Sequence, residues 1–186
     1  MKRIVILASG SGTLAQAIFD ARLEADIVAV ISDQPNAAVL DRAHKAHIET
    51  FTIPMLPDRT EWDRELETLI AALKPDLVVS AGFMRILSER ITSRFKIINS
   101  HPALLPLFPG AHAVRDALAA GATETGTTIH WVDAGVDTGQ VIAQERVEIH
   151  PGDTEESLHE RIKIVERGLI VATITSLLTT LEKKNG

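Results

Sequence analysis

The sequence contains no cysteine among its 186 residues, which excludes disulfide bonds and thiolate metal sites and favours a cytoplasmic protein. It also contains no run of lysine and arginine, and its formal net charge is −6. This charge disfavours nucleic-acid binding, so a substrate has to be held by local groups. The apolar run at residues 4–8 is too short for a signal peptide, and no segment reaches transmembrane length, so no membrane association is expected.

The composition that is present is typical of a folded domain. Hydrophobic residues make up 45% of the chain and charged residues 24%, which argues against disorder. A chain of this length buries roughly 70% of its unfolded surface, enough for a substantial core. Because no linker or repeat divides the sequence, we predict a single domain over residues 1–186.

Strand-like and helix-like segments alternate along the first 120 residues. The predicted strands, which are short and apolar, are 3–8, 27–31, 49–53, 77–80 and 95–99. The predicted helices, which show helical periodicity, are 14–23, 37–46, 61–73, 88–94 and 111–120. From residue 125 the period changes to two, which predicts strands 127–132 and 139–147. A long helix from 154 toward 181 and a fraying tail over 183–186 follow.

This order of elements predicts an α/β fold. We expect a Rossmann-like three-layer domain whose sheet is mostly parallel, with an antiparallel C-terminal portion. Three unusual loops, at 9–13, 81–85 and 99–110, each follow a predicted strand. Because the carboxyl ends of parallel strands meet at one edge of a sheet, these loops should converge there.

The first of these loops, SGSGT at residues 9–13, joins a strand to a helix. That geometry presents backbone N–H groups to a phosphate, and a Cβ at Gly12 would push the anion away. The alternative is an ordinary turn between a strand and a helix, since a single glycine loop is weak evidence for a phosphate site. Gly10-x-Gly12-x-x-Ala15 also fits the dinucleotide fingerprint, and Asp33, about 20 residues later, stands where an NAD-binding protein has its ribose-binding acid. An NAD-dependent oxidoreductase is therefore an alternative.

The segment with the most chemical character is KIINSHPALLPLFPG, residues 96–110. Asn99 and His101 come at the end of a predicted strand, and the prolines that follow hold the loop stiff without helix or sheet. Open α/β sheets place ligands at such positions. The alternative is a proline-rich connection whose histidine is only a satisfied polar group.

Two motifs that are missing from the sequence limit the reactions that these residues can catalyse. No Gly-x-Ser-x-Gly elbow is present, so an acyl-enzyme is not expected. The spacings of His101, His112 and His130 match no zinc signature, so no metal is predicted. An amide and an imidazolium, Asn99 and His101, suit an oxyanion, and the carboxylate of Asp137 can stabilise the imidazolium and carry a proton. This set suits direct acyl transfer to an amine.

Four stretches carry a resemblance to a known family: ILASGSGTLAQAI, SAGFMRIL, INSHPALLPLFPGAH and GTTIHWVDAGVDTGQVI. In this order they resemble the glycinamide ribonucleotide formyltransferases of purine biosynthesis, over essentially the whole chain. The Asn-x-His-Pro-x-Leu-Leu-Pro motif is shared with other 10-formyltetrahydrofolate enzymes. The glycine loop, the PGAH continuation and the chain length favour the ribonucleotide branch, because related methionyl-tRNA formyltransferases and deformylases carry an extra domain.

The resemblance implies two small-molecule substrates, 5-phosphoribosyl-glycinamide and the co-substrate 10-formyltetrahydrofolate. It implies three catalytic residues, Asn99, His101 and Asp137. The implied ribonucleotide contacts are Gly12, Thr13, Leu14 and Glu166. The implied folate contacts are Arg59, Met84, Arg85, Ile86, Leu87, Asn99, Asp133, Ala134, Gly135, Val136 and Asp137.

Two positions depart from the family pattern. Leu14 stands where the family commonly has asparagine, so we expect a change in affinity and not in chemistry, since backbone N–H groups remain. Leu107 stands where the family often has lysine, so a role of that charge is not carried over. For Glu166 the alternative is plain solvent exposure in mid-helix. A non-catalytic folate- or nucleotide-binding module is the third interpretation of the chain, which the retained triad argues against.

Overall fold

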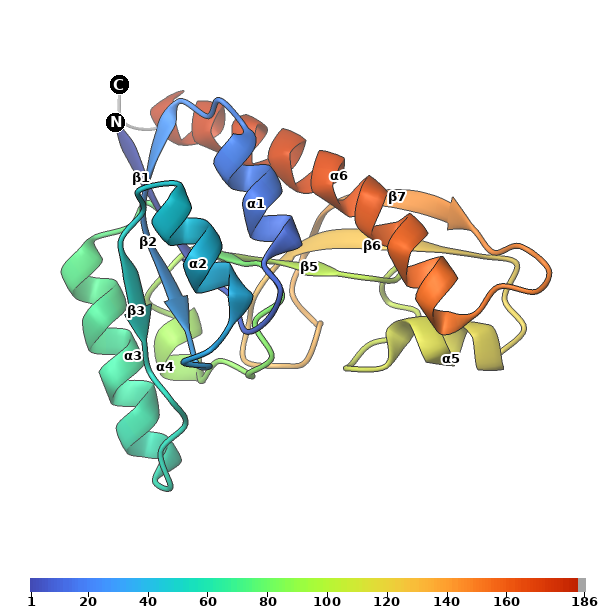
Figure 1. The fold of residues 1–186 in the computed structure, drawn as a ribbon, viewed down its shortest axis with the longest axis horizontal. Coiled ribbons are helices and arrows are strands. Elements are labelled where there is room, and N and C mark those ends of the chain that lie inside the picture. The colour runs from blue at the N-terminus through green and yellow to red at the C-terminus, as the bar shows by residue number, and fades with distance from the viewer. Residues whose placement is uncertain (184–186) are drawn as a thin grey trace.

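The computed structural model describes the backbone of residues 1–183 and the side chains of residues 1–180. From residue 184 on, the predicted tail lies outside the described residues. Within them, seven strands form one sheet in the order β3-β2-β1-β4-β5-β6-β7 (Figure 1). Their bounds are β1 (Lys2–Leu7), β2 (Ala25–Ser32), β3 (Thr50–Thr52), β4 (Leu77–Ser80), β5 (Ile97–His101), β6 (Glu124–Trp131) and β7 (Val141–Glu148). The neighbours among β1 to β5 are parallel, whereas β6 and β7 are antiparallel, which confirms the predicted sheet.

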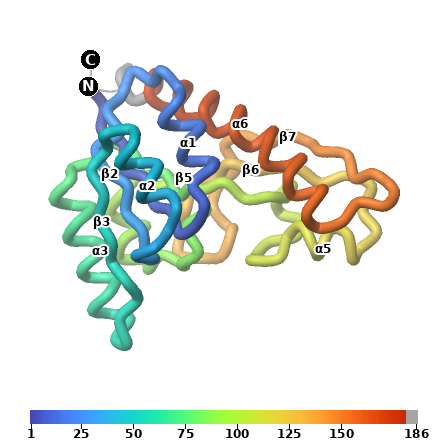
Figure 2. Tube along the Cα trace, in the orientation of Figure 1, coloured from blue at the N-terminus to red at the C-terminus, as the bar shows by residue number. Residues whose placement is uncertain are grey.

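Helices cover both faces of this sheet, as a three-layer fold requires. They are α1 (Thr13–Asp20), α2 (Ala38–Lys45), α3 (Arg59–Leu73), α4 (Glu89–Thr92), α5 (Ala113–Ala119) and α6 (Glu155–Lys183). One core cluster joins the sheet to α1, α2 and α6, and another joins it to α3 and α4. In Figure 2 the N-terminal half of the chain, blue to green, occupies one side of the molecule, and α6 runs back from the other side toward it.

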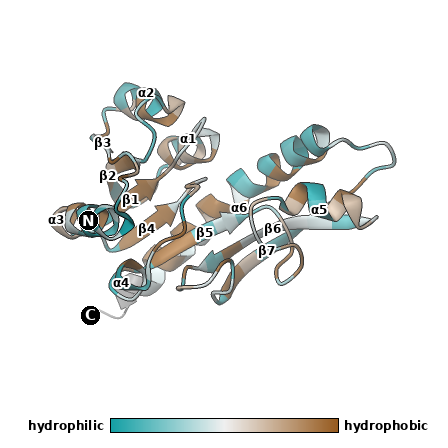
Figure 3. Ribbon diagram, turned by 90° about the horizontal axis from the view of Figure 1, so that it is seen from below, coloured by the Kyte–Doolittle hydropathy of each residue, from teal (hydrophilic) through white to brown (hydrophobic). Residues whose placement is uncertain are grey.

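The two core clusters show why β1 forms where it does. Successive side chains of a strand point to opposite faces, so Ile4 and Ile6 pack under α1, α2 and α6, while Val5 and Leu7 pack under α3 and α4. All four are fully buried, and burying such a side chain contributes about 1.5–3 kcal/mol. A strand covered on both faces therefore reads as a continuous apolar run, visible in Figure 3 as the hydrophobic colouring of β1 and β4.

Several boundaries differ from those predicted. The helix expected at 14–23 ends at Asp20, and the helix expected at 88–94 covers only Glu89–Thr92. The fifth strand, expected to end at residue 99, continues to His101 because β6 pairs with it in antiparallel register, His101 opposite Thr128. His101 therefore lies on the strand and not in the loop after it. No helix in the described part of the chain is long and apolar enough to cross a membrane.

Candidate active site

A cavity of about 630 Å³ opens where β1, β4 and β5 reach their carboxyl ends. Its walls are the glycine loop, the segment after β4, the end of β5, the loop between β6 and β7, and one side of α6. The expected convergence of the three loops is thus confirmed. The predicted site residues in its lining are Gly12, Thr13, Leu14, Met84, Arg85, Ile86, Leu87, Asn99, His101, Asp133, Gly135, Val136, Asp137 and Glu166.

Gly12 gives the glycine loop its shape. It is the N-cap of α1 and has a positive φ of 73°, which glycine adopts without strain. A Cβ there would lie 2.6 Å from the side chain of Val39 on α2. A side chain at this position would therefore also disturb the packing of α2 against the loop, and its effect on a phosphate stays a prediction. Leu14 is buried in the core beneath α1, which accounts for an apolar residue at this position.

His101 is held between two acceptors. Its Nε2 lies 2.8 Å from the carbonyl oxygen of Phe108, which can only accept, so this nitrogen carries a proton. Its Nδ1 lies 3.3 Å from Oδ2 of Asp137. A neutral ring with its proton on Nε2 would turn a lone pair toward that carboxylate. The doubly protonated imidazolium is the form that satisfies both partners.

Asp137 is fixed from the backbone as well as from the rings around it. It has a positive φ of 54°, and its Oδ2 accepts the N–H of Gly110 at 2.8 Å. Burial raises the pKa of the Asp137 carboxyl, but the adjacent His130 ring, the N–H of Gly110 and the adjacent His101 ring lower it, and the net pKa is below its ordinary value. Asp137 is therefore a carboxylate at neutral pH.

His130 belongs to the same cluster, and the sequence reasoning gave it no role in the site. It lies opposite Asn99 in the β5–β6 register, and its Nε2 is 3.3 Å from the Asn99 amide nitrogen and 3.5 Å from Oδ1 of Asp137. Its Nδ1 contacts the carbonyl of Trp131 at 2.9 Å. One N–H of Asn99 is thereby directed to His130, and the second is left for a ligand. Only the strand register could have identified His130, because a sequence does not show which residues face each other.

Glu166 is buried and not solvent-exposed, so that alternative is wrong. It accepts a short hydrogen bond from the hydroxyl of Ser100 on β5. Burial raises the pKa of Glu166 more than the bond from Ser100 lowers it. His159 and Lys163, also on α6, line the same wall of the cavity, and the sequence analysis predicted neither of them. Burial and the charge of Lys163 lower the pKa of His159.

The segment after β4 and the 133–137 loop give the cavity an apolar rim. Met84, Ile86 and Val136 are 66%, 58% and 46% exposed, and all three line the same cavity. Two predicted folate residues, Arg59 and Ala134, are outside the lining. Arg59 nevertheless donates to the carbonyl of Ile86, so it holds that part of the rim from behind.

A tight turn at Asp133 sets the position of the 133–137 loop. One oxygen of its carboxylate accepts the N–H of Gly135 at 3.0 Å and the hydroxyl of Thr138 at 2.6 Å. A Cβ at Gly135 would lie 2.1 Å from that hydroxyl. The turn thus fixes the positions of Val136 in the rim and of Asp137 together, so a deletion here would disturb both.

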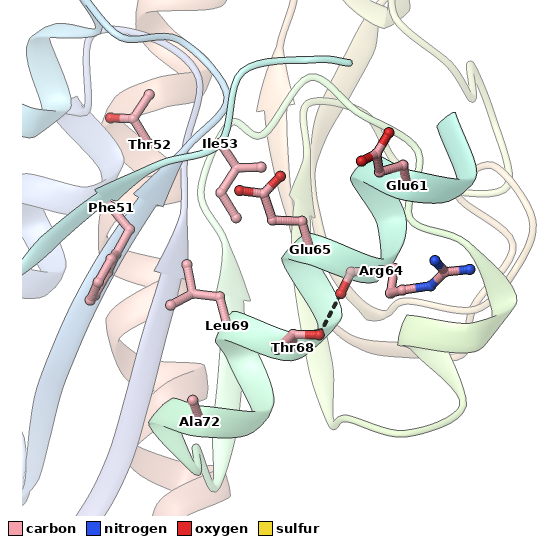
Figure 4. Close-up of a pocket in the computed structure, with 9 residues that line it drawn as sticks. All are labelled: Phe51, Thr52, Ile53, Glu61, Arg64, Glu65, Thr68, Leu69 and Ala72. Carbon is pink, nitrogen blue, oxygen red and sulfur yellow. Dashed lines mark hydrogen bonds between the residues drawn. The ribbon is translucent and has the colours of Figure 1, made fainter. Parts of the chain in front are cut away.

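A second hollow of about 650 Å³ lies between β3 and α3 and shares no lining residue with the first (Figure 4). Phe51 and Leu69 line it with polar side chains of α3, and Thr68 already donates to the carbonyl of Arg64 at 2.7 Å. Volume alone does not mark a site. The first cavity is distinguished by the buried imidazole of His101 next to the partly buried amide of Asn99 and carboxylate of Asp137.

Asp33 does not present its carboxylate to the cavity, contrary to the NAD alternative. Its side chain is 1% exposed and binds Ser9, Gln34 and Arg85. A ribose hydroxyl would find no free oxygen there. Among the residues whose side chains are described, no group of three or more histidine, aspartate and glutamate side chains is placed to hold a metal ion. The absence of a bound metal stays a prediction.

The sequence matches the formyl transferase family over residues 2–174. The chain belongs to this family. Phosphoribosylglycinamide formyltransferase of Mycobacterium tuberculosis is 49% identical, and the alignment covers 95% of this chain and 85% of that protein. Glycinamide ribonucleotide transformylase 1 of Symbiobacterium toebii has a similar structure, with a TM-score of 0.91 and 40% identity over 94% of this chain and 86% of that one. The trifunctional purine biosynthetic protein adenosine-3 of Drosophila pseudoobscura is 44% identical to this formyl transferase. That alignment covers 89% of this chain and 13% of the Drosophila protein.

Proposed function

We propose that this formyl transferase moves the formyl group of 10-formyltetrahydrofolate to the amine of 5-phosphoribosyl-glycinamide in purine biosynthesis. The observation that carries the proposal is the cluster of Asn99, His101 and Asp137 in one cavity at the end of β5. The similarity to phosphoribosylglycinamide formyltransferases supports the choice of substrates. The chain acts as a single domain, and the cytoplasm is its expected location.

The ribonucleotide lies along the glycine loop and α6. Its phosphate binds the backbone N–H groups of Gly12, Thr13 and Leu14 at the N-terminus of α1, where the helix dipole favours an anion. Glu166 contacts the same substrate from α6. The wall that Glu166 shares with Lys163 supports this arrangement, since it lies along the same cavity as the glycine loop.

The folate covers the apolar rim. Met84, Ile86 and Val136 gain from being covered by its flat apolar surface, and backbone groups of the 84–87 and 133–137 segments bind its polar edge. Arg85, Leu87, Asp133, Gly135 and Asp137 lie along the same path. Arg59 acts through Ile86, whose carbonyl it binds, and Ala134 acts as part of the 133–137 segment.

The reaction is a direct attack. The neutral amine of the ribonucleotide adds to the formyl carbon, and the formyl oxygen becomes negative. The free N–H of Asn99 and the imidazolium of His101 hold this oxygen. Because Nε2 of His101 donates to the carbonyl of Phe108, its N–H is shared between that carbonyl and the substrate oxygen.

Asp137 has two tasks in this mechanism. Its carboxylate keeps His101 protonated through the contact at Nδ1. It also accepts the proton that the attacking nitrogen loses and returns it, directly or through water, to the folate nitrogen that leaves. The C–N bond to the ribonucleotide forms, the C–N bond to the folate breaks, and no electron acceptor is needed.

The deciding experiment follows folate absorbance while the protein is incubated with both substrates. We expect turnover only when both substrates are present, and we expect NAD to have no influence on its rate. If the protein binds both ligands and no formyl group is transferred, it is a binding module. A thermal-shift measurement with NAD and with glycinamide ribonucleotide separately tests the oxidoreductase alternative, for which NAD alone would stabilise the protein.

A further inference from the structure

Asp33, at the end of β2, joins two walls of the cavity without lining it. Its carboxylate accepts the hydroxyl of Ser9 at 2.5 Å and Nε of Arg85 at 2.7 Å, and the side chain of Gln34 donates at 3.1 Å. Ser9 begins the glycine loop, whereas Arg85 belongs to the rim after β4. The proposed mechanism uses neither the carboxylate nor the serine.

Ser9 completes the connection between the two walls. Its hydroxyl donates to Asp33 and accepts the N–H of Met84 at 2.9 Å, while its own N–H donates to the carbonyl of Gly82 at 3.1 Å. Five hydrogen bonds therefore meet at one serine and one carboxylate, and the four that do not involve Gln34 tie residues 82–85 to the start of the glycine loop. If the glycine loop or the 82–85 segment moves, the other has to move with it, or one of these hydrogen bonds breaks.

The charge of Asp33 is well suited to hold such a junction. Burial raises the pKa of its carboxyl, but the hydrogen bonds from Ser9, Arg85 and Gln34 together lower that pKa by more. The net pKa is below its ordinary value, so the group stays ionised. The pair resists separation because the Asp33 side chain is 1% exposed, so without Arg85 its charge would be left buried and unpaired. The junction is thus a stiff link between the walls and not a loose contact.

We propose that Asp33 is a positioning residue that couples the two substrate subsites of this enzyme. A phosphate on the glycine loop fixes Ser9, Ser9 and Asp33 fix Met84 and Arg85, and the folate then meets a rim already in place. The inference rests on the proposed function, since it assigns the ribonucleotide to one wall and the folate to the other. By linkage, each ligand strengthens the binding of the other by the same factor.

The test measures this factor by calorimetry with glycinamide ribonucleotide and tetrahydrofolate, a pair that carries no formyl group to transfer. In the wild type, a saturating amount of one ligand should tighten the other at least about fivefold. In Asp33→Ala this coupling factor should fall to less than about two, so that the two ligands bind almost independently. Asp33→Asn, which keeps an acceptor for Ser9 but not the charge, should fall between. Ser9→Ala, a milder change that leaves the ion pair, should also reduce the factor.

The matched control is Glu67→Ala. Glu67 is likewise a buried carboxylate held by arginines, Arg90 and Arg94, but it joins α3 to the α4 region outside the cavity. Its loss should lower the melting temperature and leave the coupling factor unchanged. The proposal is overturned if Asp33→Ala keeps the wild-type factor, if the control loses it, or if the wild type binds both ligands independently while turning over. Failure of the wild type to bind either ligand would instead reject the proposed function.

Discussion

The triad and the rim of the cavity are built in opposite ways. His101 is buried, and Asn99 and Asp137 are partly buried. Asn99 donates to His130 on β6, His101 donates to the Phe108 carbonyl, and Asp137 accepts the N–H of Gly110. Met84 and Ile86, by contrast, are each more than half exposed to solvent. The triad is preorganised by the fold, whereas the rim gains most of its burial only when a ligand covers it.

This difference predicts where each kind of substitution should act. Groups fixed in advance cost no reorganisation when charge develops, so their loss should slow the chemical step. Groups waiting to be covered contribute through apolar area, so their loss should weaken binding of ground state and transition state alike. The predictions below test this division, beginning with the largest effect.

His101→Ala and Asp137→Asn should each lower kcat by a factor on the order of 10² or more, with a much smaller change in KM. The double variant should lose less than the product of the two, because the side chains act as a unit. Steady-state kinetics measure both. Asp116→Asn, on the exposed side of α5, is the control and should leave the kinetics unchanged. A near-normal kcat for Asp137→Asn would remove the carboxylate from the mechanism.

His130→Ala should lower kcat about tenfold, less than loss of a triad member. It removes one hydrogen bond that orients the Asn99 amide and one contact to Asp137, and a bond worth about 1.4 kcal/mol corresponds to that factor. KM should change little. A loss as large as that of His101→Ala would place His130 among the groups that contact the reacting atoms.

Met84→Ala and Ile86→Ala should raise KM for the folate by about fivefold each, which corresponds to about 1 kcal/mol of lost apolar contact. Their kcat should stay near that of the wild type, and the KM for the ribonucleotide should not change. Ile164→Ala removes a similarly exposed side chain outside the cavity and serves as control. A fall in kcat without a rise in KM would contradict the division between triad and rim.

The smallest effect concerns stability against pH. The pKa of Asp137 is lower in the folded protein than its ordinary value of 3.8, so its carboxylate stabilises the fold above pH 3.8. This contribution should be lost as pH falls through the lower folded pKa. The difference in free energy of unfolding between wild type and Asp137→Asn, from urea titrations, should therefore shrink as the pH falls below about 5. A difference that grows on acidification would reverse the sign of the assigned shift.

The elements of the fold could be predicted from the sequence because their cause is local or periodic. The apolar run from Ile4 to Leu7 predicts a strand covered on both faces, and Gly12 between a strand and a helix predicts the turn that begins α1. Asn99, His101 and Asp137 could be selected because their chemistry is complementary and their motif is distinctive. The element boundaries were less predictable: β5 reaches His101 only because β6 pairs with it.

Tertiary structure alone decided which side chains face each other. His130 joins the site through the antiparallel register opposite Asn99, and Glu166 is buried because α6 brings it against Ser100. Gly12 is required by the approach of Val39 from another helix, and Asp33, which the sequence offered as a ribose-binding acid, is occupied by Ser9 and Arg85. A sequence specifies residue types and periods, but contacts between distant segments depend on register and packing, which exist only once the sheet has formed.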